Sequence, residues 1–526
     1  MTKEGARYLC LHLTAHLPFV CHAERAGRPE EGWLQEAVAF SFLPLLRALD
    51  RLADDGVRFR LSLALSPPLV AMLRQDLLVR RCARALERHC EVADREVRRT
   101  RRDPALHPLA VHYRDEARSL SALFSERYRR DLVGAFRRLQ DAGLVEIATS
   151  AATHAFLPLL AAQPEAVRAQ VAVAVSHYRR HFGREPPGFW LPECGHYPGV
   201  GELLAESGLR YFFVDAHGVG DATPRPRYGV FAPISAGGAA AFGRDPESSA
   251  ALWGSDRGYP RDPAYRDFYR DIGWDLEWRE VEGALRPGGR RNLGIKYFAN
   301  GGGSVYDPRR GAKRAEEHAA RFLADRNRQL AHLSARMAGA SPVVVAPCDA
   351  ELFGHWWYEG PRFLESLLRG AASDPALRLA TPSDYLAENP EVQLATPPFC
   401  SWGGGGYAGA WLDGSNDWIW RHLHQAAGRM AALATDFAEP DPLLRRALEQ
   451  AAREVLLAQS SDWAFMLRAG TSVDYAIRRI REHLLRFARL HDQIRAQRVD
   501  PAELARVESA DDLFPEIDYR AFRRRP

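Results

Sequence analysis

Short runs of apolar residues, each closed by polar residues or proline, recur along the first two thirds of the chain. Runs without polar alternation are typical of strands buried on both faces, as in parallel sheets. The predicted strands are residues 7–14, 58–65, 145–149, 188–191, 211–214 and 342–346. Helical or mixed segments separate them. This alternation predicts an α/β fold, a parallel barrel whose ligand chemistry lies at the carboxyl ends of the strands.

Two stretches are instead charged and helically periodic. Residues 69–118 are longer than one crossover helix requires, so we interpret them as a helical insertion in the barrel. Residues 415–498 read as long amphipathic helices rich in Ala, Leu and Arg. Because 526 residues exceed the usual limit for one core, we divide the chain into a barrel domain, residues 1–397, and a helical C-terminal domain, residues 398–526.

Composition narrows the classes of function. The 71 Lys and Arg are dispersed among 67 Asp and Glu, which favours a solvated surface over a nucleic-acid-binding stripe. The seven cysteines contain no CxxC pair and imply neither a disulfide framework nor a zinc knuckle. We find no signal peptide and no run long enough to span a bilayer. We therefore expect a cytoplasmic protein with no nucleic-acid or membrane partner, and we expect a monomer.

Two tracts carry the candidate chemistry. Residues 190–195 read WLPECG and residues 346–360 read APCDAELFGHWWYEG, so each places a carboxylate among aromatic residues, small residues and a proline. Aromatic faces stack on the apolar faces of sugar rings, and carboxylates from two distant segments can flank a glycosidic bond as nucleophile and general acid. The tracts indicate a carbohydrate-active enzyme.

Glu193 and Asp349 are the catalytic candidates within these tracts. Glu193 follows a proline on a constrained turn after a strand, as a nucleophile requires; a helix cap or a surface salt bridge is the structural alternative. Asp349, packed against apolar groups and other carboxylates, would have the raised pKa of a general acid. Asp349 could instead cap a helix, and Glu351 could fill the acid role on composition alone.

Histidines near the predicted strand ends are further candidates. His12 and His16 form an H-x3-H pair, and with His154, Asp215 or His217 they could hold a divalent metal. Such spacing is weak evidence, so we prefer hydrogen bonding to sugar hydroxyls for these side chains. We therefore expect neither a metal nor a cofactor.

Tryptophans in glycine-containing segments are candidate stacking platforms. Trp402 and Trp411 lie in the run SWGGGGYAGAWLDG, and Trp274 lies in DIGWD. If exposed, they would indicate a ligand surface; packing into the core is the alternative. The glycine run itself is no phosphate loop, because no Lys-Ser or Lys-Thr follows it.

These tracts resemble the conserved regions of glycoside hydrolase family 57, and within it the 1,4-α-glucan branching enzymes. The resemblance spans most of the chain, and the third and fourth regions are highly specific. The five regions appear in order as residues 12–18, residues 143–154, residues 190–195, the tract around Asp349, and residues 401–418.

The resemblance implies a (β/α)7 barrel, an incomplete relative of the eightfold barrel, with an inserted segment and a helical domain that closes the cleft. It implies a retaining mechanism on an α-glucan without a metal, with Glu193 as nucleophile and Asp349 as acid and base. A branching enzyme passes the glycosyl intermediate to a 6-hydroxyl to form an α-1,6 branch. The residues that would line the substrate subsites are His12, His154, Asp215, Trp274, Trp402 and Trp411.

Two departures from the family bear on transfer. The fifth region commonly has Glu where this chain has Gly404, and branching enzymes carry a tyrosine on a mobile loop over the cleft. The matching segment, residues 235–242 (SAGGAAAF), has none, and Tyr228 is the nearest. An α-glucan hydrolase or a 4-α-glucanotransferase of the same family is therefore the alternative.

Two further hypotheses belong to other classes. A metal-dependent deacetylase-like enzyme on a related barrel would lose activity to a chelator and would depend on His12 and His16. A non-catalytic glycan-binding module would keep Trp402 and Trp411 while tolerating the loss of Glu193.

Overall fold

A curled, mostly parallel sheet organises the computed structural model, which describes residues 6–21, 30–254, 256, 258–285, 289–337 and 339–524. Its parallel strands lie in the order β8-β1-β2-β3-β4-β5-β7. Their bounds are β1 Tyr8–Ala15, β2 Leu61–Leu65, β3 Val145–Ser150, β4 Gly188–Trp190, β5 Tyr211–Val214, β7 Ala239–Gly243 and β8 Val343–Asp349. The predicted parallel barrel of the (β/α)7 type is confirmed.

The two outer parallel strands of this sheet approach each other. The backbone N–H of Asp245, just beyond β7, donates to the carbonyl of Val345 in β8 at 2.8 Å. The interior is filled by a separate apolar cluster that includes Cys10, Trp190 and Phe213. The barrel is therefore a packed core, and a ligand has access only at its rim.

Residues 235–242 form a tight β-hairpin, so the expectation of a loop over the cleft is wrong. Strand β6 (Ile234–Ala236) runs antiparallel to β7, and Gly237 and Gly238 turn the chain at φ of 63° and 95°. Because β7 runs parallel to β5, this turn lies at the amino ends of the parallel strands. The candidate carboxylates lie at the opposite edge. The remaining short strands are β9 (Arg378–Leu379), beside β1, and β10 (Gln393–Leu394), beside β6.

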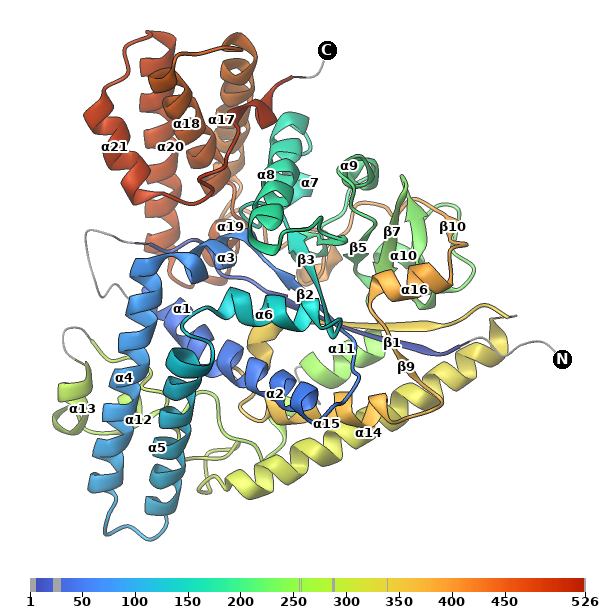
Figure 1. The fold of residues 1–526 in the computed structure, drawn as a ribbon, viewed down its shortest axis with the longest axis vertical. Coiled ribbons are helices and arrows are strands. Elements are labelled where there is room, and N and C mark those ends of the chain that lie inside the picture. Colours follow the sequence, from blue (N-terminus) through green and yellow to red (C-terminus); the bar gives the residue numbers. More distant parts are fainter. Residues whose placement is uncertain are drawn as a thin grey trace.

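Helices surround the sheet, and α4 and α5 project from it as a long pair (Figure 1). Those up to residue 388 are α1 Glu31–Ala37, α2 Leu43–Asp54, α3 Pro67–Arg74, α4 Asp76–Arg99, α5 His107–Ala122, α6 Leu132–Asp141, α7 Leu157–Leu160, α8 Pro164–Phe182, α9 Val200–Glu206, α10 Ala216–Gly220, α11 Pro246–Trp253, α12 Ile272–Asp275, α13 Trp278–Leu285, α14 Pro308–Arg336, α15 Gly360–Ala372 and α16 Pro382–Glu388. Shorter 3-10 and π-helical turns are Val38–Phe42, Leu123–Arg127, Pro192–Cys194, Gly229–Phe231, Tyr259–Arg261, Ala350–Leu352, Gly404–Gly406 and Tyr519–Phe522.

The last helices gather at one end of the molecule (Figure 1). They are α17 Trp418–Asp436, α18 Pro442–Ala458, α19 Ser461–Ala469, α20 Val473–Arg495 and α21 Pro501–Ala510. Helix α19 lies closest to the sheet, and its first residues reach the carboxyl ends of the strands, as the contacts described below show. Among the described helices, none has the length and apolar character needed to cross a membrane.

Candidate active site

Glu193 stands on a strained turn directly after β4. Its φ of 63° and that of Cys194, 51°, lie in the left-handed region, which residues with a side chain rarely adopt. The next residue is a glycine because a Cβ at Gly195 would come within 2.7 Å of the Phe156 ring. Strain of this kind persists where the surrounding structure fixes it, and it is common at active sites.

Two hydrogen bonds hold the Glu193 carboxylate. The Trp402 Nε1–H donates to Oε2 at 2.7 Å, and the Ser461 hydroxyl donates to Oε1 at 2.9 Å. Burial, with 16% of the side chain exposed, raises the Glu193 pKa to about 7, and the charges of Asp462 and Asp349 add to this shift. The two donors act in the opposite direction, because they stabilise the ionised form. The Glu193 carboxyl thus has a raised pKa, and two neutral hydrogen-bond donors partly stabilise its ionised form.

Asp349 ends β8, across the sheet from the Glu193 turn. Burial raises its pKa to about 7, and the nearby Arg244 guanidinium opposes the shift. The side chain makes no capping hydrogen bond to the short helix that follows. Glu351, in that helix, is buried, and burial together with the charge of Asp349 raises its pKa well above the usual range. Two carboxyl groups, Glu193 and Asp349, therefore titrate near neutral pH at one edge of the barrel.

Asp215 follows β5 and positions Arg244. The buried Asp215 carboxylate accepts from the Arg244 guanidinium at 3.0 Å, and that guanidinium lies 5.8 Å from the Trp402 ring centre. Arg244 comes directly after β7, a strand that sequence patterning missed. Arg244 supplies the positive charge that acts on Asp349.

His12 is buried in the mouth of the barrel. Its ring stacks on Trp190 at 5.2 Å and lies 4.1 Å from the Phe213 ring. The Nδ1 atom is 2.9 Å from the Ser62 hydroxyl, while Nε2 is buried without a hydrogen-bond partner. Burial lowers the His12 pKa to about 3, so the ring is neutral. The unpartnered nitrogen suits a hydrogen bond to a ligand hydroxyl.

His154 lies beside the Glu193 carboxylate, with its Nε2 4.0 Å from Oε1. The ring stacks on His16 at 3.6 Å, and burial and His16 lower the His154 pKa well below its usual range. His16 in turn is 3.0 Å from the Asp462 carboxylate. Within the described residues, neither histidine belongs to a group of three ligating atoms close enough for a metal ion.

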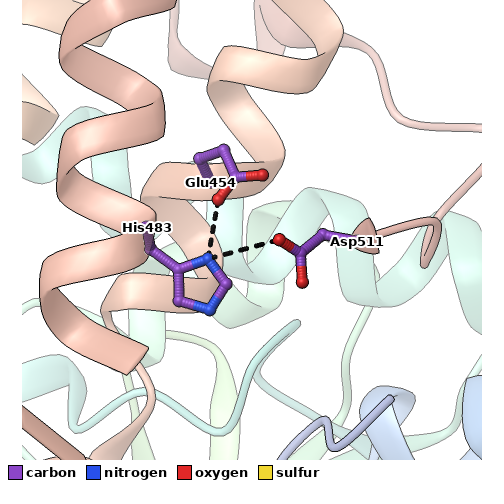
Figure 2. A group of neighbouring side chains, drawn as sticks. All are labelled: Glu454, His483 and Asp511. Carbon is purple, nitrogen blue, oxygen red and sulfur yellow. Dashed lines mark hydrogen bonds and ion pairs between the residues drawn. The ribbon is translucent and has the colours of Figure 1, made fainter. Parts of the chain in front are cut away.

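The group that does have such spacing lies in the helical region. Glu454, His483 and Asp511 come from α18, α20 and the end of α21, and their side chains point toward one another (Figure 2). The His483 Nδ1 is 2.6 Å from Glu454 and 3.7 Å from Asp511. Arg479 and Arg486 both pair with Asp511. Because the two arginines already neutralise the carboxylates, this group is a buried network that ties helices together.

The three candidate tryptophans have different environments. Trp402 is half-buried and binds Glu193. Trp411 is buried and stacks on Phe156 at 4.9 Å, so it packs beneath the loop that carries His154. Trp274 is 53% exposed on α12 and donates to Asn292 at 3.0 Å. Among the described contacts, none joins Trp274 to Glu193 or Asp349.

Several residues of the site gave no signal in the sequence. Ser461 and Asp462 begin α19, more than 250 positions beyond Glu193, and serine and aspartate at a helix start are usually caps. Two exposed aromatics outside the Glu193 and Asp349 tracts, Trp253 and Tyr407, were not candidates either. Trp253 and Trp356 are paired with ring centres 5.6 Å apart, and Tyr407, 57% exposed, lies 5.2 Å from the His217 ring.

Fold and site together define an enzyme that acts on glycosidic bonds. Two buried acids project from well-separated strands of a packed barrel, and aromatic side chains surround them. Comparison with known proteins gives the family. The family model "Glycosyl hydrolase family 57" matches residues 10–265, and the model "1,4-alpha-glucan branching enzyme, C-terminal" matches residues 422–522.

Curated relatives match along most of the chain. A 1,4-alpha-glucan branching enzyme of Thermococcus kodakarensis is 32% identical, over 93% of this chain and 74% of the relative. A probable 1,4-alpha-glucan branching enzyme of Mycobacterium tuberculosis is 32% identical over 98% of both chains. The protein belongs to glycoside hydrolase family 57.

Solved structures share the whole architecture. The novel alpha-amylase AmyC from Thermotoga maritima superposes with a TM-score of 0.92 at 41% identity, covering 99% of this chain and 100% of its own. The branching enzyme of this family from Pyrococcus horikoshii superposes with a TM-score of 0.88 at 31% identity, covering 99% of this chain and 97% of its own.

Proposed function

We propose that this protein is a 1,4-α-glucan branching enzyme that cleaves an α-1,4 linkage and transfers the released chain to a 6-hydroxyl. The observation that supports cleavage is the pair Glu193 and Asp349, two acids with pKa values of about 7 at one rim of the barrel; transfer rests on the similarity to branching enzymes. The relatives that share this architecture from end to end include proteins named for the same activity.

Glu193 is the nucleophile and Asp349 the acid and base in this proposal. The Glu193 carboxylate attacks the anomeric carbon, while the Asp349 carboxyl gives its proton to the leaving 4-oxygen, so a glycosyl ester forms on Glu193. The ionised Asp349 then takes the proton of an acceptor 6-hydroxyl. That oxygen displaces Glu193 from the anomeric carbon, and the two inversions retain the α configuration.

The hydrogen bonds decide which acid holds the proton. Both carboxyl groups titrate near pH 7, so each is partly protonated at neutral pH. Trp402 and Ser461 donate to Glu193 and favour its ionised form, leaving the proton on Asp349. Activity should fall at low pH as Glu193 gains a proton and at high pH as Asp349 loses one.

Replacing Trp402 with Phe tests this division of roles. The change removes the Nε1–H donor, so the Glu193 pKa rises and the acidic limb of the kcat/KM profile moves to higher pH. A hydrogen bond to a charged group contributes about 1.5–3 kcal/mol, so kcat/KM at neutral pH should fall about 10- to 100-fold. Trp278→Phe, at a partly exposed tryptophan on α13, is the control. An unshifted acidic limb in the Trp402 variant would remove this residue from the mechanism.

Transfer requires that an acceptor hydroxyl reach the intermediate before water does. Tyr407 is an exposed aromatic residue on the segment that carries Trp402. It follows the turn 403–406 after Trp402, and His217, which contacts its ring, is fixed by a 2.9 Å contact with the Gly406 carbonyl. We infer that an acceptor chain stacks on this ring.

Tyr407→Ala should therefore lower the ratio of transfer to hydrolysis. The expected drop is about fivefold, equivalent to about 1 kcal/mol of lost stacking, while the total cleavage rate stays nearly constant. Tyr407→Phe keeps the ring and should behave as the unmodified protein. Product analysis on amylose measures both rates, and an unchanged ratio in the Ala variant would show that the acceptor binds elsewhere.

An amylase-like hydrolase is the second candidate function. It is favoured by the 41% identity to the protein named alpha-amylase AmyC. The catalytic pair is the same in both candidates, so the products distinguish them. With a branching enzyme, short linear chains are released from the amylose product only after treatment with an α-1,6-debranching enzyme. A hydrolase releases short chains without that treatment, together with new reducing ends, and debranching adds no more.

An α-glucan is thus the proposed partner. All seven cysteines are unpaired, which suits the reducing compartment expected from the sequence. We propose a monomer acting in the cytoplasm, and gel filtration with light scattering tests the oligomeric state.

A further inference from the structure

A cavity of about 310 Å³ lies among α2, α5, α14 and α15. These helices lie together on one side of the strands in Figure 1, whereas α19, which carries Ser461, lies on the other. Among the described contacts, no residue lining the cavity touches Glu193 or Asp349. The cavity is therefore separate from the catalytic edge.

Aromatic rings form much of its wall. Phe40, Tyr113, Tyr306 and Tyr358 line it, and the Arg266 guanidinium lies 3.9 Å from the centre of the Tyr358 ring. Rings and a stacked guanidinium present flat, partly apolar faces. Such faces suit the apolar face of a sugar ring.

Two buried polar atoms in this wall lack hydrogen-bond partners. They are Nε of Arg266 and Oε2 of Glu359, in residues that are 7% and 4% exposed. An unsatisfied buried donor and an unsatisfied buried acceptor each carry a desolvation cost, unless a ligand or water completes them. A donor and an acceptor in the residues of one wall match the hydroxyl groups of a polyol, each of which both donates and accepts.

Carboxylates offset the charges of the arginines around the cavity. Glu359 lies beside Arg266, whose backbone N–H donates to the Glu359 Oε1 at 3.0 Å. Arg47 forms a two-bond pair with Glu116, at 2.9 and 2.5 Å, and Arg362 binds Glu316 at 2.6 Å. Burial lowers the pKa of His112, so its ring adds no charge at neutral pH. An anionic ligand such as a phosphate ester would have to displace these carboxylates. The surroundings favour a neutral ligand.

We propose that this cavity is a second, non-catalytic binding site for a glucosyl unit of an α-glucan. The class of ligand rests on the proposed function, whereas the neutral polyol chemistry rests on the cavity itself. When one part of a long glucan chain is bound in this cavity, the rest of the same chain has a raised effective concentration at the catalytic rim. The site therefore favours polysaccharides over short oligosaccharides.

A cavity-filling substitution tests the proposal. Ala312 lines the cavity from the partly exposed face of α14, and Ala320, an exposed residue of the same helix, does not line it. In the Glu193→Gln background, which cannot turn over substrate, calorimetric titration with maltoheptaose should show two sites. Adding Ala312→Phe should leave one, and adding Ala320→Phe should leave both. With Glu193 intact, Ala312→Phe should raise the KM for amylose about tenfold at unchanged kcat.

The outcomes separate the cavity from the catalytic proposal. One site before and after Ala312→Phe overturns the second site and leaves the proposed function standing, whereas no binding of maltoheptaose at all counts against both. Tighter binding of glucose 6-phosphate than of maltoheptaose at this site overturns the neutral ligand class. Glu359→Gln, which preserves side-chain size, gives an independent test if Ala312→Phe impairs folding: unchanged binding at both sites in this variant would contradict the proposal.

Discussion

Replacing Glu193 with Gln should lower both cleavage and transfer on amylose by about four orders of magnitude or more, because an amide cannot form the glycosyl ester. The substitution is nearly isosteric: the amide oxygen can accept from the Trp402 Nε1–H, and the amide NH2 can donate to the Ser461 hydroxyl oxygen. The loss should therefore appear in kcat and not as loss of fold.

The same variant should also change how the stability of the fold depends on pH. The Glu193 pKa of about 7 in the folded protein lies above its ordinary value, so this carboxyl favours the unfolded state increasingly as pH rises from about 4.5 to about 7. Glu193→Gln should thus melt at the same temperature as the unmodified protein near pH 4 and at a higher temperature at pH 8. Glu185→Gln, at a surface pair with Arg179, is the matched control and should change neither activity nor stability. Measurable turnover by the Glu193 variant would exclude Glu193 as the nucleophile.

Replacing Asp349 with Asn should lower activity on amylose by about two to four orders of magnitude, the range that general acid catalysis contributes. The leaving 4-oxygen then departs without a proton. A maltosyl fluoride needs no such proton, so cleavage of that substrate should recover to a large extent, and the glycosyl ester on Glu193 should accumulate and be visible by mass spectrometry.

The decisive measurement for Asp349 compares the activity of the Asn variant on amylose with its activity on the maltosyl fluoride. Asp115→Asn, at an exposed aspartate on α5, should retain full activity on both. Equal losses on amylose and on the fluoride would mean that Asp349 acts by some route other than proton donation. Glu351, which is buried close by and stays protonated because burial and Asp349 raise its pKa, would then be the next candidate acid.

Sequence patterning found the strands whose apolar runs are continuous, such as β1 and β8, which were predicted at residues 7–14 and 342–346. It missed β7, because its sequence AAAFG has little strand propensity and is a strand only through its neighbours β5 and β6. The same composition made residues 235–242 look like a loop. The hairpin is specified by tertiary pairing, which a single sequence does not display.

A site residue could be predicted from the sequence when the residues next to it in the chain were enough to mark it as a candidate. Glu193 and Asp349 stand out by their neighbours, and the tracts place each at a strand end. Ser461 and Asp462 could not be found this way, because their importance arises only when α19 packs against the strand ends. Exposure is likewise a property of the fold: Trp411 is buried, and Trp274 is exposed. The roles of the tryptophans, like the domain boundaries at 397 and 398, stay predictions.

The central claim is that the glycosyl intermediate passes to a glucan hydroxyl in preference to water. Incubation with amylose, followed by proton NMR of the anomeric region together with a reducing-end assay, measures both fates in one sample. The account predicts new α-1,6 signals that clearly outnumber new reducing ends, and the absence of both in Glu193→Gln. New reducing ends without α-1,6 signals would contradict it and make the protein a hydrolase on this scaffold.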